Sequence, residues 1–259
     1  MKENGSIESI RRYPSPNAKV NLFEILYWSQ GLRVKGLLAK PKEEGTYDAL
    51  LYLRGGLQSV GMVRASRIAQ FASQGFIVFA PYYRGNRGGE GRDEVAGDDR
   101  YDAIHAAEVL KKFVDVKDIH LFGFSRGGLM ALWTAILRED IKSVVTWAGV
   151  SSVTSMYMER VDMRRTLKRI IGGSPNTEQE KYDERTPLFQ AHLVNAPVLL
   201  IHGTEDENVS INQSYDLEQK LISEKKQVET WYSSGLGHHY PPNVNRKTVK
   251  ALCEWMKSQ

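Results

Sequence analysis

Residues 119–137 read IHLFGFSRGGLMALWTAIL, and this stretch decides the fold. Its start, Ile119–Phe122, fits a strand, and Gly127–Leu137 is apolar almost all round, which is typical of a buried helix. Between them, Gly123-Phe124-Ser125-Arg126-Gly127 places a serine on a sharp turn, where glycines make room for a strained backbone. The helix start brings backbone N–H groups and the positive end of the helix dipole beside the serine oxygen. The stretch predicts that Ser125 is a nucleophile; an ordinary glycine-rich connection is the other interpretation.

Short apolar runs alternate with helical periodicity on both sides of this stretch. The alternation predicts parallel strands joined by crossover helices, hence an α/β fold with a mostly parallel central sheet flanked by helices. Strands are expected at Val20–Trp28 and Leu32–Ala39, which form a pair, and at Asp48–Leu53, Phe76–Ala80, Ser143–Trp147, Val198–Ile201 and Val228–Tyr232, the last at an edge. Helices are expected at Ala65–Ala72 and Asp99–Val114, and a closing helix contains Val249, Leu252, Cys253 and Met256.

The segment 151–196 is the only long excursion between two predicted strands. Its first half fits a helix with an apolar stripe on one face and arginines and lysines on the other. The charged face is either the solvated surface of a small cap or part of a mobile lid over a pocket that favours anionic substrate groups. The second interpretation makes Arg164 and Arg165 candidate substrate-binding residues. We expect one domain, residues 1–259, with a small helical cap-like insertion at residues 151–196.

The composition argues against several other classes of protein. Of the 259 residues, 41% are hydrophobic and 25% charged, which fits neither a disordered chain nor a collagen-like or coiled-coil one. A net charge of +4 is too weak to imply nucleic acid, and no apolar stretch approaches the roughly 18 residues of a membrane-spanning helix. The first six residues lack a signal-peptide core, and Cys253 is the only cysteine. We expect a cytoplasmic protein without nucleic-acid or membrane partners, and homo-oligomer formation stays open.

A serine hydroxyl needs a base to remove its proton, and that base needs a carboxylate to orient it. Among the six histidines, His238 and His239 lie in the loop Gly235–Pro241, between the edge strand and the closing helix. Loops beyond strand ends commonly hold the catalytic groups of such sheets. No further ligands appear at metal-site spacing around this histidine pair, so we expect neither a metal nor a cofactor.

The carboxylate should fall between the serine and the histidine in chain order. The turn Gly203–Val209 follows a predicted central strand and contains Asp206, but a glutamate flanks it on each side, so position alone leaves the identity open. Ser125, Asp206 and His238 follow one another in the expected order, each just beyond a strand.

The oxyanion of an acyl-transfer intermediate also needs two hydrogen-bond donors. The backbone N–H of Arg126, directly after the serine, is expected to be one of them. The other is expected from the turn Arg54-Gly55-Gly56, where missing side chains let the backbone approach the substrate, and Gly56 is favoured. A simple turn after a strand is the alternative.

Several segments resemble, in order along almost the whole chain, the catalytic domain of the prolyl oligopeptidase family within the alpha/beta-hydrolase superfamily. They are Arg54-Gly55-Gly56, Tyr83-Arg84-Gly85-Asn86-Arg87-Gly88-Gly89, Gly123-Phe124-Ser125-Arg126-Gly127-Gly128, Pro197–Asp206 and Gly235-Leu236-Gly237-His238. The resemblance implies an alpha/beta-hydrolase fold in which Ser125 is the nucleophile, Asp206 the orienting acid and His238 the general base. Arg54, Tyr83 and Arg84, in the first two segments, are further candidates for contact with substrate.

The expected function is hydrolysis of a small carboxylic ester or a short peptide through an acyl-enzyme on Ser125. Larger relatives carry a propeller domain before the hydrolase, whereas residues 1–47 here supply only a few strands, and this favours the ester. One alternative is a serine peptidase or aminopeptidase acting on oligopeptides. A second is a non-catalytic receptor or interaction protein with the same fold, and a third is nucleic-acid binding through the basic face at residues 160–169.

Overall fold

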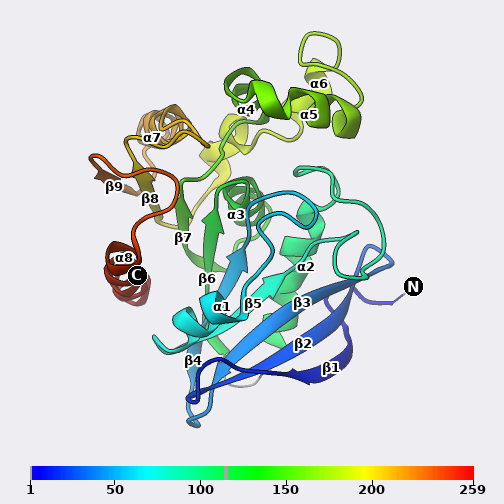
Figure 1. Ribbon diagram of the computed structural model, residues 1–259, viewed down its shortest axis with the longest axis vertical. Helices are drawn as coiled ribbons and strands as arrows, with labels where there is room; N and C mark the ends of the chain where they lie inside the picture. Colours follow the sequence, from blue (N-terminus) through cyan, green and yellow to red (C-terminus); the bar gives the residue numbers. More distant parts are fainter. Residues whose placement is uncertain (1, 114–115) are drawn as a thin grey trace.

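The computed structural model describes residues 2–113 and 116–259. These residues form one nine-stranded sheet with helices on both faces (Figure 1). The strands are β1 (Ile7–Tyr13), β2 (Val20–Ser29), β3 (Leu32–Pro41), β4 (Tyr47–Leu53), β5 (Phe76–Pro81), β6 (Val116–Phe124), β7 (Ile141–Trp147), β8 (Val198–Gly203) and β9 (Val228–Ser233). The helices are α1 (Ala65–Ala72), α2 (Arg100–Lys111), α3 (Gly127–Ile136), α4 (Val153–Glu159), α5 (Arg164–Ile171), α6 (Gln179–Asp183), α7 (Asn212–Ser223) and α8 (Pro242–Lys257), with 3-10 turns η1 (Val161–Met163) and η2 (Pro187–Leu193).

The strands lie in the order β1-β2-β3-β5-β4-β6-β7-β8-β9. Strands β4 to β9 pair in parallel, whereas β1, β2 and β3 form an antiparallel extension that joins the sheet through β5. Every residue of β5 and of β8 is buried, because helices cover both faces of these strands. The predicted α/β class with a mostly parallel central sheet is confirmed.

The two faces of the sheet pack against separate cores, because side chains alternate between the faces along each strand. In β4, Leu51 and Leu53 join the core that α2, α3 and α7 cover, whereas Leu50 and Tyr52 join the core under α1 and α8. The second core contains Cys253 of α8. Burial raises the pKa of this thiol to about 12.

Strand β1 and helix α7 lie outside the sequence-based expectations. Most residues of β1 are exposed, so this edge strand shows no run of buried apolar side chains. Helix α7 buries Gln213 and Ser214 beside Leu217 and Leu221, and these polar residues mask its apolar face. The helix expected to end at Val114 ends at Lys111, and residue 114 lies outside the described residues.

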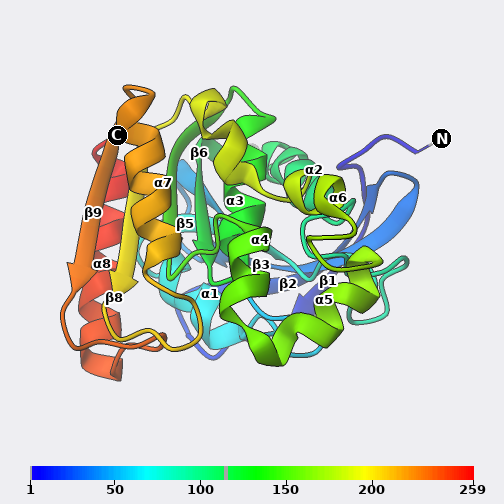
Figure 2. The same cartoon turned by 90° about the horizontal axis from the view of Figure 1, so that it is seen from above.

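The helix expected in the first half of the segment 151–196 is interrupted. Helix α4 ends at Glu159, and Arg160 leaves the helical region with φ −104° and ψ 80°. The chain resumes as η1 and then α5, which buries Leu167 and Ile171. Helices α4, α5 and α6 lie together beyond the end of the sheet toward which β6 points (Figures 1 and 2).

Two absences hold for residues 2–113 and 116–259. No helix there has the length and apolar character needed to cross a lipid bilayer. The same residues contain no group of three or more His, Cys, Asp or Glu side chains arranged to hold a metal ion.

Candidate active site

Ser125 occupies a strained turn between β6 and α3. Its φ of 56° lies in the left-handed region, which is uncommon for a residue with a side chain. The backbone holds this conformation from both sides: the Ser125 N–H donates to the Trp147 carbonyl at 3.0 Å, and the Ser125 carbonyl accepts from Gly128 and Val150 at 2.9 and 3.0 Å. A side chain at Gly127 would collide with the Leu53 carbonyl at the end of β4, which explains the glycine there.

The turn after β4 approaches the serine closely. A Cβ atom on Gly55 would lie 2.7 Å from the Ser125 Cβ and 3.2 Å from its Oγ, so only glycine fits. Gly56 follows with φ 68°, a left-handed conformation that favours glycine. Among the described residues, the Ser125 hydroxyl has no hydrogen-bond partner. The hydroxyl is therefore free to meet a substrate beside this turn.

Asp206 and His238 form a direct pair in the loops after β8 and β9. The His238 Nδ1 lies 2.7 Å from the Asp206 Oδ2, while the other carboxylate oxygen accepts from the backbone N–H groups of Asn208 and Val209 at 2.8 and 2.9 Å. The His238 ring packs against Phe124, the residue before Ser125, with ring centroids 4.9 Å apart. The structure thus brings the predicted histidine and aspartate to the serine turn.

A second histidine contacts the same carboxylate. His202, at the end of β8, is fully buried and places its Nε2 3.3 Å from the Asp206 Oδ2. Burial alone would raise the pKa of Asp206, but the hydrogen bonds from His202, His238 and Val209 hold it well below the usual range. Asp206 is therefore an anion, and it is suited to orient an imidazole and to stabilise its cation.

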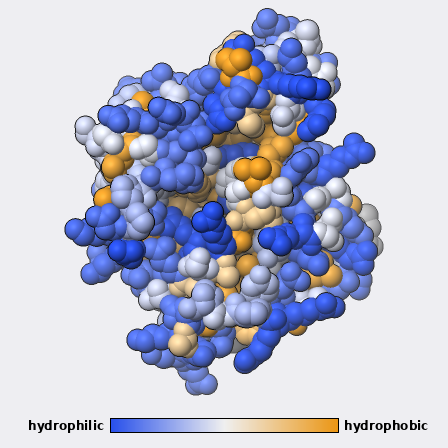
Figure 3. Space-filling model, viewed as in Figure 1, coloured by the Kyte–Doolittle hydropathy of each residue, from blue (hydrophilic) through white to orange (hydrophobic). Residues whose placement is uncertain are grey.

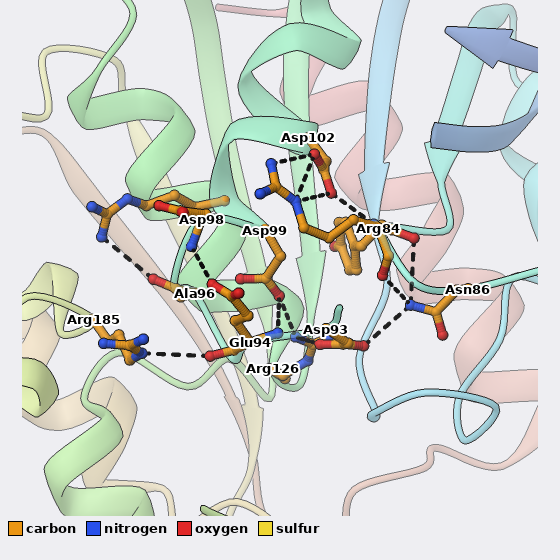
Figure 4. A network of polar contacts seen from close by, with 12 residues as sticks. Arg84, Asn86, Asp93, Glu94, Ala96, Asp98, Asp99, Asp102, Arg126 and Arg185 are labelled. Carbon is orange, nitrogen blue, oxygen red and sulfur yellow. Dashed lines mark hydrogen bonds and ion pairs between the residues drawn. The ribbon is translucent and has the colours of Figure 1, made fainter. Parts of the chain in front are cut away.

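A buried ionic cluster supports the turn after β4 (Figure 4). The side chain of Arg126 donates from Nε to the Gly56 carbonyl at 2.6 Å, and its terminal nitrogens contact Asp93 at 2.8 Å and Asp99 at 3.1 Å. Arg54 donates to the carbonyls of Gly55 and Val60 at 2.9 and 3.1 Å. Two guanidinium groups thus hold the same turn by its backbone carbonyls, and one of them belongs to the residue after the serine.

Burial and charge act in opposite directions on the carboxylates of this cluster. Burial would raise the pKa of Asp93, but Arg126 and Arg54 outweigh it and lower that pKa. Asp99 is completely buried, and desolvation raises its pKa to about 7 despite the attraction of Arg126. One of its oxygens, Oδ1, has no hydrogen-bond partner within the described part of the chain. The cluster thus favours the charged form of Asp93 and disfavours that of Asp99.

The candidate substrate-binding residues in the first two family segments lie inside the protein. Arg54 is only 1% exposed, and Tyr83 is buried with its ring near the guanidinium groups of Arg54 and Arg126. Arg84 is buried and forms an ion pair with Asp102 at 2.9 Å. These side chains are engaged with the protein, which leaves them no free group for a substrate and gives them a structural role around the turn.

The two candidates on the segment 151–196 differ from each other. Arg164 donates to the carbonyls of Tyr157 and Met158 at 3.0 and 2.9 Å, so its guanidinium group satisfies the carboxyl end of α4. Arg165 is exposed on α5. Only the latter has an unoccupied guanidinium group.

Sequence reasoning missed the side-chain role of Arg126 and the contributions of Asp93, Asp99 and His202. The two aspartates lie in a charged loop whose composition is that of a solvated segment, so no signal marks them. His202 carries a faint signal, because it stands four residues before Asp206 across the turn after β8.

A mostly parallel sheet with a serine on the turn into a buried helix, and with an acid and a histidine on later strand ends, defines the alpha/beta-hydrolases. Comparison with known proteins narrows this class. The model of the prolyl oligopeptidase family matches residues 62–259. The chain belongs to the prolyl oligopeptidase family, and with this assignment it is a serine hydrolase of the peptidase or esterase kind.

The proteins similar to this chain are of two sizes. The uncharacterized peptidase YtmA of Bacillus subtilis (strain 168) is 56% identical over 252 residues, which cover 96% of this chain and 98% of that protein. A solved acylaminoacyl peptidase, in complex with Z-Gly-Gly-Phe-chloromethyl ketone, has a TM-score of 0.79 and 22% identity. The match covers 92% of this chain but only 41% of the peptidase chain. An acetyl xylan esterase from Paenibacillus sp. R4 has a TM-score of 0.77 and 17% identity, with 98% and 89% coverage. The two solved structures show the likeness of fold.

Proposed function

We propose that the protein hydrolyses small carboxylic esters through an acyl-enzyme on Ser125. The observation that carries this proposal is the 2.7 Å contact between the His238 Nδ1 and the Asp206 Oδ2 beside the strained turn of Ser125. The contact leaves the Nε2 of His238 to receive the serine proton. The acetyl xylan esterase, of which this chain covers 89%, is a precedent for an ester substrate in this fold at similar length.

The reaction follows from these positions. His238 accepts the hydroxyl proton as the Ser125 oxygen bonds to the acyl carbon, and the carbonyl electrons move onto its oxygen. The intermediate collapses when His238 returns that proton to the leaving alcohol and the bond between acyl carbon and alcohol oxygen breaks. Water then attacks the acyl-enzyme, with His238 as base, and releases the acid. Asp206 stays ionised throughout and stabilises the cation of His238.

The developing oxyanion is bound by the backbone N–H groups of Gly56 and Arg126 in this proposal. The Arg126 N–H lies at the start of α3, where the helix dipole adds positive potential. Its guanidinium group donates a hydrogen bond to the Gly56 carbonyl at 2.6 Å, so the side chain of Arg126 fixes the position of one donor residue relative to the other. Donors fixed before the reaction cost no reorganisation when the charge develops.

The segment 151–196 acts as a cap in this proposal. Its helices α4, α5 and α6 lie over the end of the sheet that carries Ser125 (Figure 2). A cap at this place shapes the entrance to the serine and restricts which substrates reach it.

Peptide hydrolysis is the second candidate function, because the similar protein YtmA is described as a peptidase. The chemistry at Ser125 is the same for both substrates, and only the leaving group differs. A panel of acyl esters and aminoacyl anilides, measured side by side, separates the two candidates.

The central experiment removes the nucleophile. Ser125→Ala should lower kcat by about 10⁴-fold or more and abolish labelling by a fluorophosphonate probe. Folding should be intact, because the Ser125 hydroxyl has no hydrogen bond to lose among the described residues. Circular dichroism and thermal unfolding serve as the control. Undiminished ester hydrolysis by the purified variant would refute the mechanism.

A further inference from the structure

A cavity of about 840 Å³ opens beside the turn that borders Ser125. Three segments enclose it: the continuation of that turn with Gln58 and Met62, the loop of residues 85–94 after β5, and the end of α5 with Arg169 and Ile170. Because these three segments enclose it, the cavity joins the part of the chain nearest the serine to the cap segment. The face of the molecule drawn in Figure 3 is largely hydrophilic, with a smaller apolar area in its middle.

The cavity wall carries three exposed arginines, Arg87, Arg92 and Arg169. None of them has a carboxylate partner within residues 2–113 and 116–259. Of the two acids on the wall, Asp93 is already paired with Arg126 at 2.8 Å and with Arg54 at 3.5 Å. Only Glu94 opposes the three cations, and one of its oxygens accepts from the Asp98 N–H at 2.9 Å. The wall therefore has an excess of positive charge.

Contacts within the loop hold the backbone that carries two of these arginines, Arg87 and Arg92. The Gly85 N–H donates to the Glu90 carbonyl at 2.7 Å, which closes the loop that carries Arg87. A Cβ atom on Gly85 would lie 2.9 Å from the Arg92 Cα, so the beginning and the end of the loop are in contact. The amide of Asn86 donates to the Arg84 carbonyl and to the Asp93 carboxylate at 3.0 and 3.3 Å. Cations on a fixed loop lose less freedom when they bind an anion.

The cavity is connected to the serine through two contacts. Gly55 packs against Ser125, and the chain continues from Gly55 directly to the cavity wall at Gln58. In addition, Asp93 in the wall accepts a hydrogen bond from the side chain of Arg126, the residue after the serine. The cavity wall is therefore joined to the serine turn by the chain itself and by one ion pair.

We propose that this cavity binds an anionic group of the substrate, a carboxylate, through Arg87, Arg92 and Arg169. The inference rests on the proposed function, because it assigns the cavity to the substrate of the Ser125 reaction. The charge excess selects anionic over neutral substrates of equal size, and the apolar side chains of Met62 and Ile170 accommodate the carbon chain that carries the charge. Arg169 replaces Arg164 as the cationic residue of the cap that meets substrate.

The test compares two esters of equal shape. One is the 4-nitrophenyl monoester of glutaric acid, and the other carries an amide in place of the distal carboxylate. We expect a higher kcat/KM for the anionic ester, and we expect that preference to fall by about tenfold in Arg87→Gln/Arg92→Gln/Arg169→Gln, since exposed ion pairs contribute about 1.5- to 5-fold each. The preference should also weaken as salt is added.

A second arm locates the anion on the substrate. Acetate esters of 4-nitrophenol with and without a ring carboxylate place the charge on the leaving group. A preference confined to this pair assigns the cavity to the leaving group, and one confined to the glutaric pair assigns it to the acyl group; either supports the proposal. The matched control is Lys168→Gln, which removes a neighbouring exposed charge of α5 that does not line the cavity.

The outcomes separate this inference from the proposed function. Hydrolysis of the neutral esters that needs Ser125, with the same anionic-to-neutral ratio in wild type and triple variant, overturns the inference alone. Should none of the esters react, the proposed function fails, and binding of glutarate to the wild type is then measured by NMR titration. Affinity about tenfold weaker in the triple variant, with Lys168→Gln unchanged, supports the anion site. Equal affinity in all three proteins overturns it.

Discussion

His238 and His239 are neighbours in the chain but meet different surroundings. His238 is bonded to Asp206, whereas His239 is exposed and stacks on Phe124 at 5.5 Å. Partial desolvation of the ring, and then the neighbouring His238, lower the pKa of His239. We expect His238→Ala to lower kcat by at least about 10³-fold, because no other base replaces it, and His239→Ala by less than about tenfold.

The measurement for this histidine pair is kcat/KM against pH on one chromogenic ester. Activity of the wild type should fall on acidification, since a protonated imidazole cannot accept the serine proton. The His239→Ala variant should keep this acid limb. A dead His239→Ala variant beside an active His238→Ala variant would move the assignment by one residue.

Asp99 is a buried carboxyl group whose charged form the fold disfavours. Its pKa is raised from 3.8 to about 7 by burial, so Asp99 stabilises the fold at low pH and loses that contribution as pH rises from about 4 to about 7. Its neighbour Asp93 has a lowered pKa, so Asp93 stabilises the fold above about pH 4 and loses that contribution as the pH falls further. We expect Asp99→Asn to flatten the pH dependence of the free energy of unfolding between about pH 4 and 7.

Urea unfolding at several pH values measures this effect. Asp98→Asn, which changes the adjacent and exposed carboxylate, is the matched control. A slope between pH 4 and 7 that is the same in wild type and Asp99→Asn would show that Asp99 keeps its ordinary ionisation.

At the scale of elements, the contact between α3 and the end of β4 is made without a side chain. A Cβ atom on Gly127 would overlap the Leu53 carbonyl and lie 2.9 Å from the Arg54 carbonyl. Gly127→Ala must therefore push the start of α3 away from β4, and overpacking of this kind costs about 1–3 kcal/mol. The shift also separates Ser125 from the turn at Gly55, so kcat should fall together with stability.

Chemical denaturation measures the loss, with Gly237→Ala as the comparison. At Gly237 the nearest atom to an added Cβ is the Glu205 carbonyl oxygen at 3.4 Å, an ordinary contact, and the backbone is not left-handed. A Gly127→Ala variant as stable as Gly237→Ala would show that α3 adjusts without strain.

At the scale of the whole molecule, the sequence predicts the parallel core because its strands contain short runs of buried apolar residues. Periodicity located α1 at its observed bounds, Ala65–Ala72, for the same reason: Ile68, Phe71 and Ala72 recur on one face. Exposed β1 and polar α7 lack these signals, and the break at Arg160 comes within an otherwise continuous stripe. Sequence reasoning detects a regular pattern of buried apolar residues. Strand β1 and helix α7 lack such a pattern and the break at Arg160 interrupts one, so contacts with neighbouring segments decide their structure.

The candidate site likewise has one part that the sequence predicts and one part that only the structure shows. Ser125, Asp206 and His238 stand in short motifs whose spacing predicts their chemistry, and the structure brings them to one end of the sheet. The cluster of Arg54, Arg126, Asp93 and Asp99 joins three distant segments, and each charge taken alone fits a solvated surface. Only the folded arrangement shows that Arg126 turns inward to the Gly56 carbonyl.

Cys253 is the only thiol of the sequence, and it lies buried in the core under α1 and α8 with its pKa raised to about 12. A thiol in this state reacts slowly with alkylating dyes. Any cysteine introduced on the surface is therefore the single fast-reacting position, without prior removal of the native one. Ser59→Cys would place an environment-sensitive fluorophore at the cavity that Arg87, Arg92 and Arg169 line, and would keep all three arginines. The emission of the labelled protein would then report when a molecule enters this cavity.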